Sequence, residues 1–328
     1  MLRKIFNTVL GVILLLGGIY LMGPRVETPD LEKPYPEVPE WSQLEEWVSQ
    51  QEAQYPNIKP GNASRLVFYD SVPQKTEISV VYLHGFSASP MEGMPGHLEI
   101  AQALKANLYL PRLYDHGLDE TDPLLDFTAE KYLDAAREAL AVGGKLGNRV
   151  VVLGTSTGGT LALQLADYPQ LAALGLYSPN VAVFDQRVEL LSKPWGLQLA
   201  KFISKGDFHT MDKITEEKKK YWTTTYRVES GPHLQKLLDV TMRKQTFEKV
   251  KVPVFMGYYY KNDSLQDRVV SVAAMQSMFE QLGTHQDDKY QQAFPEAGDH
   301  VILGAITNQN YQEVVMASIA FFKEKLSL

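Results

Sequence analysis

The stretch Val150–Thr160, VVVLGTSTGGT, decides the fold of this chain. Its four β-branched or aliphatic residues predict a buried strand, which runs directly into Gly-Thr-Ser-Thr-Gly at residues 154–158. A helix-forming stretch follows, so the order is strand, Gly-x-Ser-x-Gly, helix, the signature of a nucleophile elbow. In such an elbow Ser156 takes a strained backbone conformation, and a side chain at either glycine would collide where strand and helix cross. The alternative interpretation is a glycine-rich turn with an incidental serine.

Composition and charge narrow the classes of protein. The chain has 328 residues, 45% of them hydrophobic, which is enough for a large core in one or two domains. The net charge is −7, and the short run Lys218–Lys220 reads as a solvated helix face, so we expect no nucleic-acid partner. The absence of cysteine excludes disulfides, a cysteine nucleophile and thiolate metal sites.

The N-terminus predicts a membrane anchor over residues 1–23. Two basic residues precede Ile5–Met22, which is almost wholly apolar. As a helix this segment spans about 27 Å, close to the hydrocarbon thickness of a bilayer. A cleaved signal peptide is the alternative, but cleavage after Gly18 or Gly23 would put leucine where a small residue is needed. Because the basic residues come first, we expect the rest of the chain outside the cytoplasm, in the periplasm if the source is bacterial.

Residues 24–60 are rich in proline and predict a stiff spacer with a short helix near Trp41–Tyr55. From residue 61 to 328, strands alternate with helices, which predicts an α/β fold with a mostly parallel sheet covered on both faces. Between Ser178 and Lys251 the rhythm breaks in an aromatic-rich stretch without a clear buried strand, so we expect a helical cap at about 181–248. The expected strands are Ser64–Tyr69, Ile78–Leu83, Asn107–Pro111, Arg149–Leu153, Ala173–Tyr177, Val252–Tyr259 and Tyr290–Phe294, and the expected helices are His97–Leu104, Thr128–Ala141, Thr157–Ala166, Val269–Leu282 and Tyr311–Lys325.

An activated serine needs a base, and the base needs an orienting acid. Of the seven histidines, His300 follows the last expected strand directly, at the carboxyl end of the sheet where the elbow also lies. The acid should follow strand Val252–Tyr259, and two aspartates do so. Asp263 lies closer to the strand end, whereas Asp267 comes just ahead of the next helix. Either aspartate gives the chain order Ser, Asp, His that this arrangement requires.

When an activated serine attacks a carbonyl group, the tetrahedral intermediate that forms needs hydrogen-bond donors for its oxyanion. The amide of Thr157, just past the serine, is one candidate. The other is the amide of Phe86, in the loop His84-Gly85-Phe86 that follows an earlier strand. The alternative interpretation of His84-Gly85 is a turn that merely ends the strand.

Four segments together resemble the α/β-hydrolase family, and within it the carboxylesterase and monoacylglycerol-lipase-like group. The resemblance covers about residues 61–328 and implies an α/β-hydrolase fold with Ser156 as nucleophile, His300 as base, Phe86 and Thr157 as oxyanion amides, and no metal or cofactor. The family's aspartate-x-valine pattern favours Asp267, whereas its usual short distance from the strand favours Asp263; we predict Asp267. The segments are Leu83-His84-Gly85-Phe86, Asp115-His116-Gly117-Leu118, Gly154–Gly159 and Ala297–Val301. The second segment departs from the family's Gly-His-Gly, so we interpret it as structural.

We therefore expect a membrane-anchored serine hydrolase that cleaves carboxylic esters through an acyl-enzyme, similar to a carboxylesterase or to a lysophospholipase or monoacylglycerol lipase. Its substrate would be a small-molecule or lipid-derived ester. Thioesterase, acyltransferase and peptidase activities on the same fold are alternatives, because a fold does not fix a substrate. A non-catalytic binding protein is an alternative of another class, and it would have lost one member of the triad.

Overall fold

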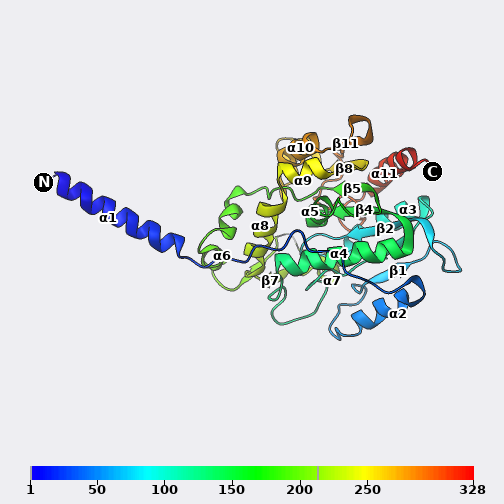
Figure 1. Cartoon of the computed structure of the whole chain (residues 1–328), viewed down its shortest axis with the longest axis horizontal. Helices are drawn as coiled ribbons and strands as arrows, with labels where there is room; N and C mark the ends of the chain where they lie inside the picture. The colour runs from blue at the N-terminus through cyan, green and yellow to red at the C-terminus, as the bar shows by residue number, and fades with distance from the viewer. Residues whose placement is uncertain (1, 213) are drawn as a thin grey trace.

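A computed structural model describes residues 2–212 and 214–328, and a seven-stranded sheet lies at its centre (Figure 1). The strands are β1 (Arg65–Val67), β2 (Thr76–Leu83), β3 (Asn107–Leu110), β4 (Gly147–Thr155), β5 (Leu171–Tyr177), β8 (Val254–Tyr258) and β11 (Lys289–Ala293). Their order is β1-β3-β2-β4-β5-β8-β11, and only β1 runs antiparallel to its neighbour. The predicted α/β fold with a mostly parallel sheet is confirmed.

Helices cover both faces of this sheet. They are α3 (Gly96–Ala103), α4 (Ala129–Leu146), α5 (Thr157–Gln164), α10 (Val272–Gln281) and α11 (Tyr311–Leu326). Successive side chains of a strand point to opposite faces, so Val81 of β2 joins the core under α4, α5 and α10 while Val80 joins the core under α3 and α11. The two apolar layers hold β4 and α5 in place, and thereby the sharp junction between them.

Among the helices that cover the sheet, two boundaries differ from the predicted ones by three residues or more. Helix α4 continues past the predicted end at Ala141 to Leu146, and Gly143 in this last part lies so close to β2 that a β-carbon would overlap Val81. Helix α10 begins only at Val272, where the hydroxyl of Ser271 caps it by accepting a hydrogen bond from the amide of Ala274 (3.2 Å). The residues predicted to open this helix belong instead to the loop that carries Asp267.

The insertion after β5 contains the expected helices but is not wholly helical. Two three-residue strands inside it, β6 and β7, form a separate antiparallel pair. No pattern in the sequence predicts these two strands, because β6 is exposed along its whole length and therefore lacks a buried apolar face. The elements are η2 (Gln186–Ser192), α6 (Gly196–Ser204), β6 (Phe208–Thr210), α7 (Glu216–Tyr221), β7 (Thr225–Arg227), α8 (Ser230–Thr241) and α9 (Lys244–Lys249). We call this insertion the cap.

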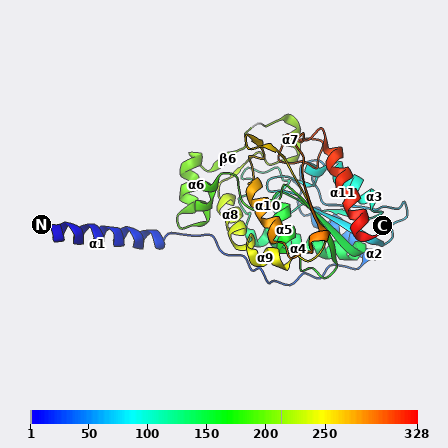
Figure 2. The same cartoon turned by 90° about the horizontal axis from the view of Figure 1, so that it is seen from above.

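An apolar N-terminal helix, α1 (Leu2–Leu21), projects away from the rest of the molecule (Figures 1 and 2). Over Arg3–Leu21 it is long and apolar enough to cross a membrane, with a mean hydropathy of 1.8, and none of it is buried against the rest of the chain. The structure therefore contains a helix of the kind that the sequence predicts as an anchor.

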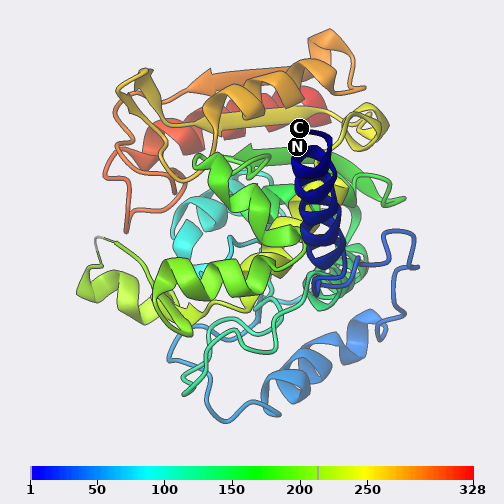
Figure 3. The ribbon, with the colours of Figure 1, turned by 90° about the vertical axis from the view of Figure 1, so that its left-hand side faces the viewer.

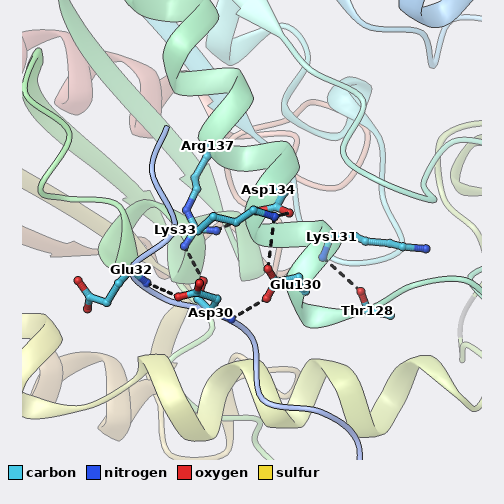
Figure 4. A network of polar contacts seen from close by, with 8 residues as sticks. All are labelled: Asp30, Glu32, Lys33, Thr128, Glu130, Lys131, Asp134 and Arg137. Carbon is cyan, nitrogen blue, oxygen red and sulfur yellow. Dashed lines mark hydrogen bonds and ion pairs between the residues drawn. The ribbon is translucent and has the colours of Figure 1, made fainter. Parts of the chain in front are cut away.

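Residues 24–40, which we call the strap, lie along the body of the protein. Arg137 of α4 is almost fully buried and donates a hydrogen bond to the carbonyl oxygen of Asp30 (2.8 Å). The amide of Asp30 donates to Glu130 (2.6 Å), and Lys33 pairs with Glu130 and Asp134 (Figure 4). The strap leads into α2 (Trp41–Glu52), which buries two apolar side chains in the core. The segment predicted as a stiff spacer is therefore bound to α4, which the sequence did not indicate.

Candidate active site

Ser156 lies at the junction of β4 and α5, in the conformation that an elbow requires. Its φ of 54° and ψ of −121° are strained for a residue with a side chain, and its amide donates to the carbonyl oxygen of Tyr177 (3.0 Å). A β-carbon at Gly158 would overlap the carbonyl oxygen of Leu83, and one at Gly154 would stand 2.6 Å from the carbonyl oxygen of Gly158. Both glycines are needed for this close crossing, as the sequence predicts.

His300 lies in the loop after β11, and Asp267 is its partner. The Nδ1 atom of His300 and the Oδ2 atom of Asp267 are 2.6 Å apart. The other carboxylate oxygen of Asp267 accepts hydrogen bonds from the amides of Val269 (2.8 Å) and Val270 (3.0 Å). Asp267 is 1% exposed, so these contacts fix both the carboxylate and the ring that it holds.

Asp263 does not contact His300 in this structure. It lies at the exposed turn between β9 (Tyr260–Asn262) and β10 (Leu265–Gln266), where it accepts a hydrogen bond from the hydroxyl of Tyr260 (2.8 Å). This small hairpin carries the chain out and back, and the amide of Asp267 then donates to the carbonyl oxygen of Tyr259 at the end of β8 (3.1 Å). Asp267 is therefore near the strand end in space although it is distant from it in sequence.

The pair makes His300 a stronger base. Burial of the ring opposes its protonation, but the charge and hydrogen bond of Asp267, together with the charges of Asp299 and Glu92, outweigh burial and hold the pKa of His300 above its usual 6.5. Its Nε2 atom is buried and has no hydrogen-bond partner within the described residues. No hydrogen bond joins Ser156 to His300 among those residues, which is common in active sites that hold no substrate.

The amides of Phe86 and Thr157 are available as hydrogen-bond donors, because neither donates to another group in the described part of the chain. The Phe86 amide is held in direction by His84. The amide of Leu113 donates to Nε2 of His84 (3.0 Å), so the ring carries its proton on Nδ1, 2.9 Å from the carbonyl oxygen of Gly85. That carbonyl belongs to the same trans peptide as the Phe86 amide, so fixing one fixes the other.

Glu92, in the short helix η1 (Pro90–Gly93), is a site residue that sequence reasoning missed. It is 1% exposed, and its Oε1 accepts hydrogen bonds from the amide of Gly85 (2.5 Å) and the hydroxyl of Tyr82 (3.1 Å). A β-carbon at Gly85 would stand 3.1 Å from the β-carbon of Ser156 and 3.4 Å from Oε2 of Glu92, so the serine and this carboxyl both lie close to Gly85. Burial raises the pKa of Glu92 to about 7. Nothing in the sequence distinguishes it from a surface glutamate.

The other histidines of the resembling segments have structural settings. The ring of His116 stacks on Tyr132 with 5.1 Å between centroids, and its Nδ1 lies 2.7 Å from the carbonyl oxygen of Tyr114. Burial lowers the pKa of His116 to about 4, so the ring is neutral.

A cavity of about 390 Å³ elsewhere in the molecule lies between α2 and α4 and includes none of the predicted site residues.

Comparison with known proteins identifies the family. The model of the alpha/beta hydrolase family matches residues 80–315, and the chain therefore belongs to that family. No curated protein matches the chain in sequence.

Solved structures share the fold at low identity. A structure from the work on LipS and LipT, two metagenome-derived lipolytic enzymes, aligns with a TM-score of 0.63 at 17% identity, over 81% of this chain and 99% of that one. A monoacylglycerol lipase from Paleococcus ferrophilus gives 0.56 at 15% identity, over 79% and 98%. Est1E from Butyrivibrio proteoclasticus, with ferulic acid bound, gives 0.54 at 15% identity, over 81% and 95%. At these identities the likeness shows the fold alone.

Proposed function

We propose that this protein is a serine hydrolase that cleaves carboxylic esters through an acyl-enzyme. The observation that carries the proposal is the buried Asp267–His300 pair, 2.6 Å apart, in a fold that sets Ser156 on a strained elbow at the same end of the sheet. The lipolytic enzymes and esterases among the solved structures of this fold add support from their named activities.

The proposed reaction uses the same groups in both half-reactions. Ser156 Oγ attacks the ester carbonyl while His300 Nε2 takes the hydroxyl proton, and Asp267 stabilises the imidazolium that results. The amides of Phe86 and Thr157 donate to the oxyanion of the tetrahedral intermediate. His300 then gives its proton to the leaving alcohol, and water repeats the sequence to release the acid. This route needs no metal and no cofactor.

The proposed substrate is a small-molecule or lipid-derived ester with an apolar acyl group. The monoacylglycerol lipase among the solved structures and the apolar helix α1 both favour a lipid-derived substrate. We propose that α1 anchors the chain in a membrane with the catalytic domain outside the cytoplasm. Two basic residues, Arg3 and Lys4, lie in the first turn of the helix, ahead of its apolar stretch, which favours this orientation.

The test uses Ser156→Ala in the full chain. We expect hydrolysis of a short-chain aryl ester to fall by at least about 10³-fold, since a triad without its nucleophile keeps only residual catalysis. The matched control is Ser264→Ala at the exposed hairpin turn, which should retain full activity. Full activity of Ser156→Ala would refute the assignment.

Labelling with a fluorophosphonate separates the enzyme from a non-catalytic binding protein. The probe should modify Ser156 covalently in the wild-type chain and fail to label the alanine variant. A thioesterase or acyltransferase would also be labelled, so a series of oxygen esters, thioesters and acyl acceptors at equal acyl length then distinguishes the reaction classes.

A further inference from the structure

One end of the cap exposes large apolar side chains that a water-facing surface does not need. Phe202 and Ile203 of α6 are 81% and 61% exposed, and Leu190 of η2 is 52% exposed. Trp195, in the turn between these two elements, is 40% exposed. We call these four residues the apolar cap face. Neighbouring apolar residues of this size on a surface mark a contact site.

The end of α1 is attached to this same place. The indole Nε1 of Trp195 donates a hydrogen bond to the carbonyl oxygen of Ile19 (3.2 Å), and its amide donates to the carbonyl oxygen of Pro24 (3.1 Å). The ring lies so close to Gly23 that a β-carbon there would overlap it. The apolar cap face therefore begins where α1 ends.

The views of the whole chain agree with these contacts. Helix α6 lies at the end of the body from which α1 projects (Figures 1 and 2), and Figure 3 looks onto that side with the cap next to α1. If α1 crosses a bilayer, its last turn lies at the membrane surface, and Trp195 lies there with it. Tryptophan is enriched at that level of a membrane, since its ring is apolar and its N–H is polar.

We propose that the apolar cap face docks on the lipid bilayer, seating the cap in the surface of the leaflet from which α1 emerges. A bilayer fits better than a protein partner, because α1 brings lipid to this face without any further binding step. Helix α6 has nine residues and spans about 14 Å, so Phe202 and Ile203 lie within about that distance of Trp195. The proposal rests on α1 being a membrane helix and is independent of the reaction at Ser156.

The absence of cysteine makes the depth of single sites measurable. Phe202→Cys and Ile203→Cys would each carry a nitroxide label in the full chain reconstituted into phosphatidylcholine vesicles. Leu14→Cys in α1 reports the anchor. Met316→Cys is the matched control, since Met316 is 63% exposed on α11 at the other end of the body (Figure 1).

We expect relaxation of the labels at 202 and 203 to respond to oxygen more than to a water-soluble nickel chelate, as at position 14, and the label at 316 to respond in the opposite sense. Labels at 202 and 203 that behave like the one at 316, with position 14 in lipid, would overturn the docking and leave the anchor standing. A water-exposed label at position 14 would overturn both.

A functional readout separates docking from catalysis. The double variant Phe202→Ser, Ile203→Ser should hydrolyse a soluble aryl ester at the wild-type rate, and an ester dissolved in vesicles at least about fivefold more slowly, through a higher KM. An equal loss of rate on both substrates would contradict docking, and so would an unchanged rate on both. A wild-type chain inactive on every ester would refute the proposed function without affecting the label measurements.

Discussion

The buried carboxyl of Glu92 gives a quantitative prediction about stability. Its oxygen accepts hydrogen bonds from Gly85 and Tyr82, and the charged groups that act on it are His300 and Lys218. These contacts favour the ionised form, but burial outweighs them and raises the pKa from its usual 4.5 to about 7. The substitution Glu92→Gln keeps an oxygen that can accept the Gly85 hydrogen bond and removes the titration.

The direction in which stability changes with pH follows from the pKa of Glu92 in the unfolded chain and in the folded chain. Between pH 4.5 and about pH 7 the folded chain keeps a proton on Glu92 that the unfolded chain has released, so the free energy of unfolding falls as the pH rises through this window. A change in pKa from 4.5 to about 7 corresponds to about 3 kcal/mol, since each tenfold change in acidity is worth about 1.4 kcal/mol. The variant does not lose this stability.

The assay is urea unfolding of both full chains in detergent micelles, from pH 4 to pH 8. We expect the free energy of unfolding of the variant, relative to wild type, to increase by about 3 kcal/mol across the series. The matched control is Glu45→Gln on the exposed side of α2, for which the difference should stay flat. A flat difference for Glu92→Gln would refute the reasoning, because it would mean that the carboxyl ionises as freely in the folded chain as in the unfolded one.

Three further predictions concern the proposed triad and the elbow. Asp267→Asn should lower kcat/KM on an aryl ester by about 10³- to 10⁴-fold, whereas Asp263→Asn should leave it within about twofold, and the reverse ranking would contradict the assignment of the acid. Because His300 must be neutral to accept the serine proton and its pKa is raised above 6.5, kcat/KM should fall about tenfold per pH unit below that pKa and level off above it; a profile flat down to pH 5 would exclude this base. Gly158→Ala should prevent folding or lower Tm sharply in thermal circular dichroism, since its β-carbon would overlap a backbone carbonyl of β2, whereas Gly206→Ala meets nothing within 4 Å and should leave Tm nearly unchanged.

The sheet and the elbow could be predicted because their signals are local. Strands such as β5 and β8 are short apolar runs, and the elbow needs two glycines at fixed spacing, so the stretch around Ser156 predicts its own conformation. The choice between Asp263 and Asp267 was harder, since it depends on the hairpin β9–β10. The two strands of that hairpin have five residues, all exposed or half-buried, and carry no periodic pattern.

Other features arise only from packing between distant segments. Glu92 becomes a buried carboxyl because η1 folds under the loop of Gly85, and nothing in the neighbouring sequence announces this. The strap shows the same effect, since proline content indicates an extended chain but not the surface on which it lies. Arg137 buries its guanidinium against Asp30, more than a hundred residues earlier in the chain.

The bound strap determines how the proposed N-terminal anchor would hold this domain. A free stretch of residues 24–40 would act as a flexible tether with a reach of up to about 60 Å. Because the strap is held along α4, the fold fixes the distance and orientation of the domain relative to the end of α1. If α1 anchors the chain in a membrane as we propose, the strap holds the domain near that membrane, where lateral diffusion brings membrane-dissolved esters to it. A proteolytic cut just after α1 would separate the domain from α1 but leave the strap attached to the domain.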